Sequence, residues 1–198
     1  MDRRTAGNLR SQVRKAYSAA ADAPSAKHPF PVGRRFAESL GYPPELIDDL
    51  PRECVEAFAG VTNISVAADL SSGAIVLDLG CGAGLDSLIA ARRIGLKGKV
   101  AGVDFSESML SRARKAATRS GLENILFCRA DGERLPFRDQ GFEVAMINGI
   151  FNLNPARHAI FSELARVLKR GGAVFASELI LREPLPERER ASEDNWFA

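Results

Sequence analysis

From residue 74 to residue 181 the chain alternates short apolar runs with amphipathic stretches, and this alternation is the strongest constraint on its fold. The run Ile75–Leu79 is apolar apart from Asp78 and stops at a glycine, which is typical of a strand buried on both faces. Residues 85–94 then place leucines and isoleucines on one side of a helix. Strands that alternate with helices through short loops form βαβ units, and these units build a parallel sheet.

The same alternation continues to a fifth strand, so we predict an α/β fold with a doubly wound, Rossmann-like, mostly parallel sheet and helices on both faces. We expect strands over 75–79, 99–105, 125–130, 142–148 and 173–181, and helices over 85–94, 106–120 and 155–169. Ser106 is a suitable N-cap for the second helix, and the glycines at 171–172 are expected to stop the third. We place Ile160 and Phe161 on the apolar stripe of that third helix.

The first 72 residues have a different character. We expect helices over 9–21, 34–40 and 52–58, and the pattern indicates no strand. The chain therefore divides into an N-terminal helical cap or lid segment (1–72), a core (73–181), and a charged tail (182–198) in which prolines interrupt the pattern.

Composition argues against several classes of protein. The 27 Lys and Arg against 25 Asp and Glu give a net charge of +2, which is too balanced for a nucleic-acid binder. No apolar run reaches the roughly 20 residues of a membrane helix, and the N-terminus has no apolar signal core. Three cysteines without paired spacing argue against a disulfide framework or a zinc site. We expect a cytoplasmic domain that binds no metal, membrane or nucleic acid.

The loop after the first strand carries the candidate chemistry. Residues 78–84 read Asp-Leu-Gly-Cys-Gly-Ala-Gly, and glycines at alternate positions let the backbone turn sharply and approach a ligand closely. Asp104 ends the second strand, where a carboxylate can accept both hydroxyls of a ribose; a helix-capping role is the alternative. A dinucleotide site would need a glycine at Leu85, and the acidic Asp78 suits a positively charged cofactor better than a pyrophosphate.

The D-x-G-x-G-x-G pattern, the strand ending in Asp104, and the Arg-Ala-Asp of residues 129–131 resemble the class I S-adenosylmethionine (SAM)-dependent methyltransferases over residues 74–181. The resemblance implies SAM as the cofactor. It assigns residues to the methionine and ribose (Gly80, Gly82, Gly84), the amino end (Asp78), the ribose hydroxyls (Asp104), the adenine (Asp131, Met109) and the surroundings of the reacting methyl group (Asn148). Core packing for Met109 and a turn-forming role for Asp131 are the alternatives.

A narrower resemblance, to arsenite methyltransferases, covers most of the chain. It rests on residues 42–45, 82–86, 147–155 and 194–196. The cysteines with which that family binds As(III) are not matched, because Gly149 stands at one position, residues 59–63 contain none, and the chain ends before a third. Its three cysteines, Cys54, Cys81 and Cys128, lie elsewhere and are interpreted as small semi-buried hydrophobes. We therefore expect a relative with a retained cofactor site and a changed acceptor site.

The resemblance also implies how the reaction proceeds. Tyr17 resembles the N-terminal tyrosine that closes over the cofactor in that family, with helix packing as the alternative. His28 and His158 belong to no motif, and His158 is expected to face solvent. We expect in-line displacement at the sulfonium methyl group, with the protein aligning the reactants and no catalytic residue assigned beyond Asn148 and Tyr17 near the methyl group.

The sequence alone names no methyl acceptor beyond a small molecule, and two other functions stay open. The missing cysteines are compatible with a non-catalytic methyltransferase-fold protein that serves as a binding or scaffold partner. The glycine turn and Asp104 are compatible with an NAD-dependent oxidoreductase, which Leu85 opposes. Related methyltransferases usually add two strands after the fifth. We therefore expect either a fragment of a longer protein, with the C-terminal strands missing, or an oligomer that pairs through the edge of the fifth strand.

Overall fold

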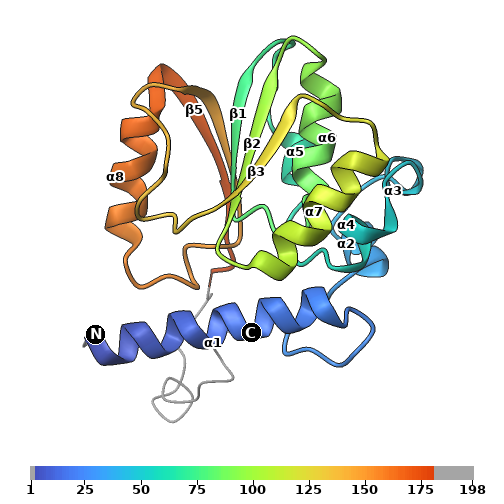
Figure 1. Ribbon diagram of the computed structural model, residues 1–198, viewed down its shortest axis with the longest axis vertical. Helices are drawn as coiled ribbons and strands as arrows, with labels where there is room; N and C mark the ends of the chain where they lie inside the picture. Colours follow the sequence, from blue (N-terminus) through green and yellow to red (C-terminus); the bar gives the residue numbers. More distant parts are fainter. Residues whose placement is uncertain (1–2, 181–198) are drawn as a thin grey trace.

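The computed structural model describes residues 3–180, in which five parallel strands form one sheet in the order β3-β2-β1-β4-β5 (Figure 1). The strands are β1 (Ile75–Leu79), β2 (Lys99–Asp104), β3 (Ile125–Arg129), β4 (Phe142–Asn148) and β5 (Leu168–Ser177). The helices are α1 (Arg3–Asp22), α2 (Arg34–Ser39), α3 (Pro44–Asp48), α4 (Arg52–Glu56), α5 (Ile64–Ala67), α6 (Leu85–Ile94), α7 (Glu107–Arg119) and α8 (Arg157–Val167). The predicted α/β class, with its parallel sheet, is confirmed.

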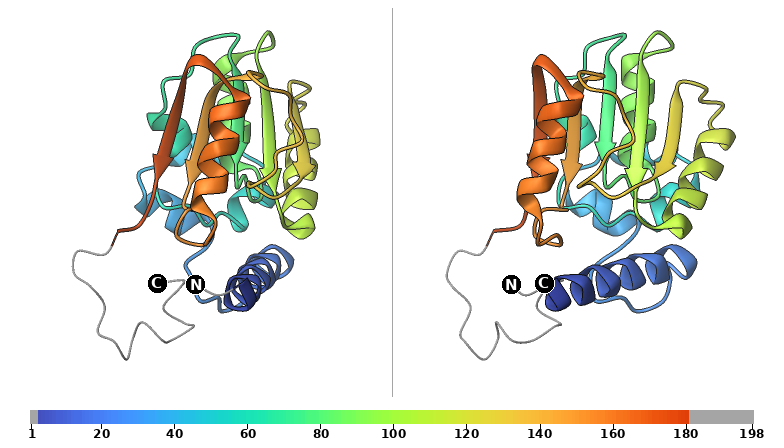
Figure 2. Two further views of the ribbon diagram at one scale, coloured as in Figure 1. Left: turned by 90° about the vertical axis from the view of Figure 1, so that its left-hand side faces the viewer. Right: turned by 60° about the vertical axis from the view of Figure 1, so that its left-hand side comes forward.

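Helices cover both faces of the sheet, as expected of a doubly wound fold. α6 and α7 lie on one face and α8 lies on the other (Figures 1 and 2). The chain therefore reverses its winding between β1 and β4, which are neighbours in the sheet although two strands separate them in sequence. In open parallel sheets a ligand binds at such a reversal, beyond the carboxyl ends of the strands.

The buried faces of the strands explain why β1 reads as a continuous apolar run. Val76 and Leu77 are completely buried, one packing with α6 and the other in the cluster under α8. Ser106 caps α7 as predicted, because its hydroxyl accepts a hydrogen bond from the backbone N–H of Met109. The burial of β1 and the capped start of α7 hold the carboxyl ends of β1 and β2 in place relative to the loops that follow them.

The boundary between α8 and β5 differs from the prediction. α8 ends at Val167, and Leu168 already pairs with Phe142 of β4, so Gly171 and Gly172 lie inside β5 and do not stop the helix. The register then shifts by several residues, which marks a β-bulge, and Gly171 takes a φ of +78° there, a conformation that glycine adopts readily. Pairing with β4 therefore overrides the helical periodicity that continues into these residues.

The predicted stripe of α8 also needs correction. Ile160 and Leu164 are buried, whereas Phe161 is 53% exposed and stacks on Phe151 with 4.6 Å between the ring centroids. One residue turns a helix by about 100°, so Phe161 points away from the face that Ile160 presents to the sheet. His158 is exposed, as expected.

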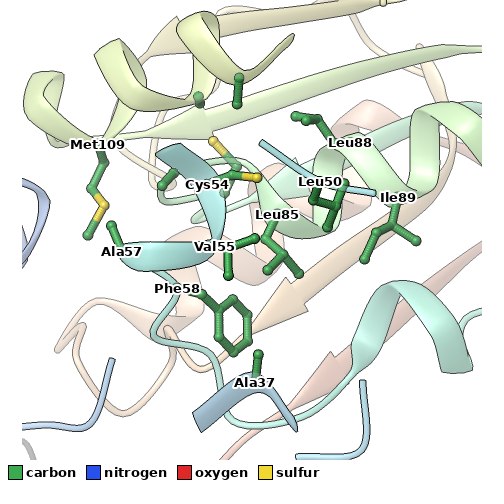
Figure 3. Packing of buried hydrophobic residues seen from close by; sticks show 14 of the residues in the cluster. Ala37, Leu50, Cys54, Val55, Ala57, Phe58, Leu85, Leu88, Ile89 and Met109 are labelled. Carbon is green, nitrogen blue, oxygen red and sulfur yellow. The ribbon is translucent and has the colours of Figure 1, made fainter. Parts of the chain in front are cut away.

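The N-terminal segment contributes helices α1 to α5, of which α3 and α5 were not predicted. Figure 3 shows residues of α4 and the turn after it, including Cys54 and Phe58, in one buried cluster with Leu85 and Leu88 of α6. The segment thus shares its core with the first helix of the sheet region. α1 lies across the end of the sheet toward which the strands run (Figures 1 and 2).

Some expectations from the sequence concern residues that lie outside the described range of 3–180 or at its end. The tail at 182–198, with its Asp-Asn-Trp at 194–196, lies outside the described residues, as does the last residue of the predicted fifth strand. Within residues 3–180, β5 pairs with β4 and with no other strand. No helix in this part of the chain combines the length and the apolar character needed to cross a bilayer.

Candidate active site

A cavity lined by residues of α1 and of the carboxyl ends of the strands lies where the winding of the sheet reverses. The glycine loop after β1 and Asp104 form one side of it, and Met109 and Asp131 line it from the segments after β2 and β3. Residues 57–60 and 148–150 line another side, and α1 contributes Tyr17. The cavity is thus lined by most of the predicted site residues, which come from separate parts of the chain.

The glycine loop is anchored to β2 by its own backbone. The N–H groups of Gly80 and Cys81 both donate to the carbonyl oxygen of Val103, at 2.8 and 3.0 Å. Gly80 has a φ of +77°, and a Cβ on it would collide with Ile150. Gly80 and Gly82 therefore present backbone without a side chain to the cavity.

Gly84 serves the packing of helices and does not line the cavity. It stands at the N-cap of α6 with a φ of +87°, and a Cβ on it would lie 3.0 Å from the Cβ of Ala113 in α7. A glycine here lets the loop and α7 approach each other closely, which brings Met109 to the cavity.

Asp104 combines both roles considered for it from the sequence. Its Oδ1 accepts the N–H of Ser106 at 2.8 Å, which holds the start of α7, and its Oδ2 accepts the N–H of Gly82 at 2.9 Å. Each oxygen keeps capacity for one more donor, and the carboxylate lines the cavity. Burial raises the pKa of Asp104 to about 6, against the opposing effect of these N–H groups.

Asp78 lies behind the loop and does not line the cavity. Its carboxylate is buried and accepts a hydrogen bond from the hydroxyl of Ser87 in α6. Burial and the nearby charge of Asp86 raise the pKa of Asp78. The structure therefore does not place Asp78 in direct reach of a ligand, and its predicted role at the amino end stays a prediction.

Asp86 lines the cavity and was not assigned a role from the sequence. Its Oδ1 accepts the hydroxyl of Tyr42 at 2.5 Å and both the N–H and the hydroxyl of Ser65, while its Oδ2 accepts the amide of Asn148 at 2.9 Å. Burial raises the pKa of Asp86 despite these donors. The only sequence signal for Asp86 was its position at the end of the 82–86 motif.

Asn148 lines the cavity, but its side-chain amide is fully occupied by the protein. Its Oδ1 accepts the N–H groups of Val61 and Thr62 at 2.8 and 3.2 Å, and its Nδ2 donates to the carbonyl of Thr62 and to Asp86, both at 2.9 Å. Asn148 therefore fastens the loop before α5 to the end of β4, and we class it as a positioning residue.

The remaining predicted residues lie at the cavity with different exposure. Met109 is 1% exposed and its sulfur faces Gly82. Asp131 is at the rim, with 62% of its side chain exposed, 4.0 Å from the guanidinium of Arg14.

Tyr17 is partly buried and stacks on Phe30 with 4.5 Å between the ring centroids. Burial and the charge of Asp104 raise the pKa of Tyr17, so its phenol keeps its proton at neutral pH.

The cysteines do not form a thiolate site. Cys54 and Cys81 are buried and line the cavity, and Cys128 is partly buried in β3. Burial raises the pKa of Cys54 to about 12 and raises that of Cys81 well above its usual range, so both are protonated at neutral pH. Across residues 3–180, no group of three His, Cys, Asp or Glu side chains is arranged to hold a metal ion.

The charge around the loop fits a cationic ligand. Asp86 and Asp104 line the cavity and are less than 10% exposed, and within the described chain neither forms a salt bridge. Buried carboxylates without a cationic partner are costly, and a bound cation would offset that cost. SAM carries a sulfonium and an ammonium group, and its ribose hydroxyls suit the open positions on Asp104. The residues present fit this cofactor.

Comparison with known proteins points the same way. A family model described as "Methyltransferase domain" matches residues 70–197. An arsenite methyltransferase of Halobacterium salinarum is 33% identical over 151 residues, which cover 76% of this chain and 38% of that protein. A demethylmenaquinone methyltransferase of Listeria monocytogenes is 38% identical over 104 residues, 52% of this chain and 44% of that protein.

A solved structure is similar over most of the described chain. It is an arsenic(III) S-adenosylmethionine methyltransferase from Chlamydomonas reinhardtii, with a TM-score of 0.62 and 30% identity over 79% of this chain and 52% of that one. The chain thus spans about half, or less, of the length of the relatives it matches.

Proposed function

This chain belongs to the methyltransferase domain family, whose cofactor is SAM, and on that premise we propose that it transfers the methyl group of SAM to a small-molecule acceptor by in-line displacement. The observation that carries the proposal is the pair of buried carboxyl groups, Asp86 and Asp104, that line the cavity beside the glycine loop without a cationic partner among the described residues. Bound SAM supplies a methyl carbon attached to a positively charged sulfur.

The chain's own residues position the reactants. Asp104 offers one open acceptor position on each oxygen to a pair of ribose hydroxyls, and the Gly82 N–H holds the carboxylate in place. Met109 supplies an apolar surface for a flat ring, and Asp131 supplies a carboxylate at the rim. Orientation of this kind is worth about 7–11 kcal/mol in favourable cases, so transfer requires no acid–base pair.

Two measurements test the proposal. Titration calorimetry should detect binding of S-adenosylhomocysteine to the chain, and radiolabelled SAM should transfer its methyl group to an acceptor supplied in solution. If neither S-adenosylhomocysteine nor SAM binds, the proposal is wrong. If both bind but no acceptor in a broad screen is methylated, the non-catalytic alternative gains support. Binding of NAD in place of SAM would favour the oxidoreductase.

A further inference from the structure

One side of the cavity is lined by apolar residues. We call it the acceptor wall and define it as residues 57–61 and 149–153. Its cavity-lining members are Ala57, Phe58, Ala59, Gly60, Ile150 and Leu153, together with Gly149. None of these side chains carries a charge or a hydrogen-bonding group. The charged lining residues lie elsewhere, on α1, at the glycine-loop side and at the rim.

The two segments of the acceptor wall meet at Val61 and Gly149. Gly149 has a φ of +80°, and a Cβ on it would lie 2.9 Å from Cγ1 of Val61. A cysteine at 149 would therefore be strained and would push against a valine. These are the two segments in which the arsenite methyltransferase resemblance would supply thiols, and both are apolar here.

The polar groups beside the wall are already occupied. The amide of Asn148 makes four hydrogen bonds within the protein. Glu178 accepts the N–H groups of Phe151 and Asn152, and Asn154 is bonded to Glu133 and to the backbone of Ala156. A polar acceptor placed against this wall would lose its hydration and gain few partners, which costs free energy.

Among the described residues that line the cavity, no histidine, thiolate or phenolate is available to remove a proton near neutral pH from a weakly acidic nucleophile. His28 and His158 do not line it, and the raised pKa values of Tyr17, Cys54 and Cys81 keep these groups protonated. Asp86 already accepts hydrogen bonds from Tyr42, Ser65 and Asn148, and Asp104 is assigned to the ribose. We therefore expect the nucleophile to lose its proton to solvent.

Building on the proposed function, we propose that the methyl acceptor is a small, largely apolar organic molecule whose nucleophile is an acidic thiol or a phenol-type hydroxyl. The thiolate or phenolate forms a bond to the methyl carbon while the bond from that carbon to the sulfonium sulfur breaks. S-adenosylhomocysteine leaves with the electron pair of the broken bond, and the proton of the acceptor has passed to solvent. The apolar body of the acceptor packs on the acceptor wall.

The test compares acceptors that differ only in charge. Thiophenol and 2-naphthol are each paired with a carboxylated counterpart, 4-mercaptobenzoate and 6-hydroxy-2-naphthoate, and arsenite is supplied with a reducing thiol. Formation of S-adenosylhomocysteine is measured with saturating SAM. We expect kcat/KM for the apolar member of each pair to exceed that of its carboxylated counterpart at least tenfold, with no transfer to arsenite above background.

A variant localises the effect. Leu153→Glu places a carboxylate in the acceptor wall, and we expect it to raise KM for thiophenol at least tenfold while the Kd for S-adenosylhomocysteine stays within twofold. Leu96→Glu makes the same change at a side chain that is 87% exposed and far from the cavity lining, and it should alter neither value. If Leu153→Glu fails to bind S-adenosylhomocysteine because it misfolds, the acceptor pairs on the unchanged protein carry the test.

The outcomes separate the two proposals. If SAM binds but arsenite or the carboxylated acceptors are methylated as well as the apolar ones, or if none of the apolar acceptors is methylated, the inference is wrong while the cofactor assignment stands. If SAM and S-adenosylhomocysteine do not bind, the proposed function itself fails.

Discussion

The glycine-loop side of the cavity and the acceptor wall present different chemistry to a ligand. At the glycine loop, bare backbone and the carboxylate of Asp104 face the cavity with open hydrogen-bonding capacity. At the acceptor wall, the polar side chains next to the cavity are bonded to the protein and apolar side chains face inward.

The glycine-loop side has the hydrogen-bonding groups to bind one defined cofactor. The acceptor wall can favour a methyl acceptor only by its shape and its apolar character. Substitutions on the two sides should therefore have different effects, and the four predictions below run from the largest expected effect to the smallest.

Removal of the Asp104 carboxylate should have the largest effect on cofactor binding. Asp104→Ala removes two acceptors for the ribose and releases the N–H of Gly82, and hydrogen bonds to a charged group contribute about 1.5–3 kcal/mol each. We expect the Kd for S-adenosylhomocysteine, measured by calorimetry, to rise about 100-fold or more. Asp131→Ala, at an exposed side chain, should raise it less. Equal effects of the two variants would contradict the site as described.

Loss of the Asn148 amide should affect folding more than cofactor binding. Asn148→Ala leaves the loop at 61–62 without its fastening and should lower the free energy of unfolding by about 2–3 kcal/mol, as read from urea denaturation. Asn152→Ala removes a nearby amide with one exposed hydrogen bond and is the matched control, with a loss below about 1 kcal/mol. If Asn148→Ala matched Asp104→Ala in its effect on S-adenosylhomocysteine binding, Asn148 would belong to the cofactor side.

The buried acids should make the unliganded protein less stable as pH rises. The pKa of Asp104 is about 6 in the folded chain and near 3.9 in an unfolded one, so between these values the folded state holds a proton that the unfolded state has lost. The free energy of unfolding therefore decreases from pH 4 to pH 6, by at most about 1.4 kcal/mol per pH unit for this proton. The raised pKa values of Asp78 and Asp86 act in the same direction.

Urea denaturation at pH 4.5, 5.2 and 6 measures this dependence. Asp104→Asn should flatten it, whereas Leu153→Asn, on the acceptor wall, should leave it unchanged. An unchanged slope in Asp104→Asn would show that the carboxyl titrates normally in the folded state.

The contact between Val61 and Gly149 should give the smallest effect. Gly149→Ala should destabilise the chain by about 1–2 kcal/mol from backbone strain at positive φ, plus a contribution from crowding of Val61. Gly121→Ala, at a φ of +62° with open space around it at the end of α7, measures the strain alone. In a double-mutant cycle with Val61→Ala we expect a coupling of about 0.5–1 kcal/mol, because the smaller side chain relieves the crowding. Strict additivity would mean that the two residues do not press on each other.

The sequence was sufficient where local pattern and tertiary pairing agree. β1, α6 and β4 have the predicted bounds because each is an apolar run or stripe ended by a glycine or a polar residue. The five-residue α3 and the four-residue α5 are too short to show periodicity. At Leu168 the helical stripe continues in the sequence, but pairing with Phe142 decides the conformation.

The part of the candidate site that lies on the glycine loop and at the strand ends could be predicted from the sequence. The glycine loop and Asp104 could be located because each directly follows or ends a predicted strand, and the family resemblance added Met109. Asp86 could not, because its partners Tyr42, Ser65 and Asn148 come from positions 21 to 62 residues away and meet only in the folded chain. Its importance depends on contacts that no local pattern records.

The position of α1 has a consequence for the order of folding. Its polar side chains bond to segments far along the chain: Ser18 meets Ser106 at a separation of 88 residues, and Arg10 meets Glu133 at 123. Closing such a long loop costs entropy before any contact repays it, so α1 gains little until α7 and the segment after β3 are in place. Its amide groups are accordingly expected to exchange with solvent deuterium before those of the central strands. We therefore expect α1 to reach its native position after the central strands have formed.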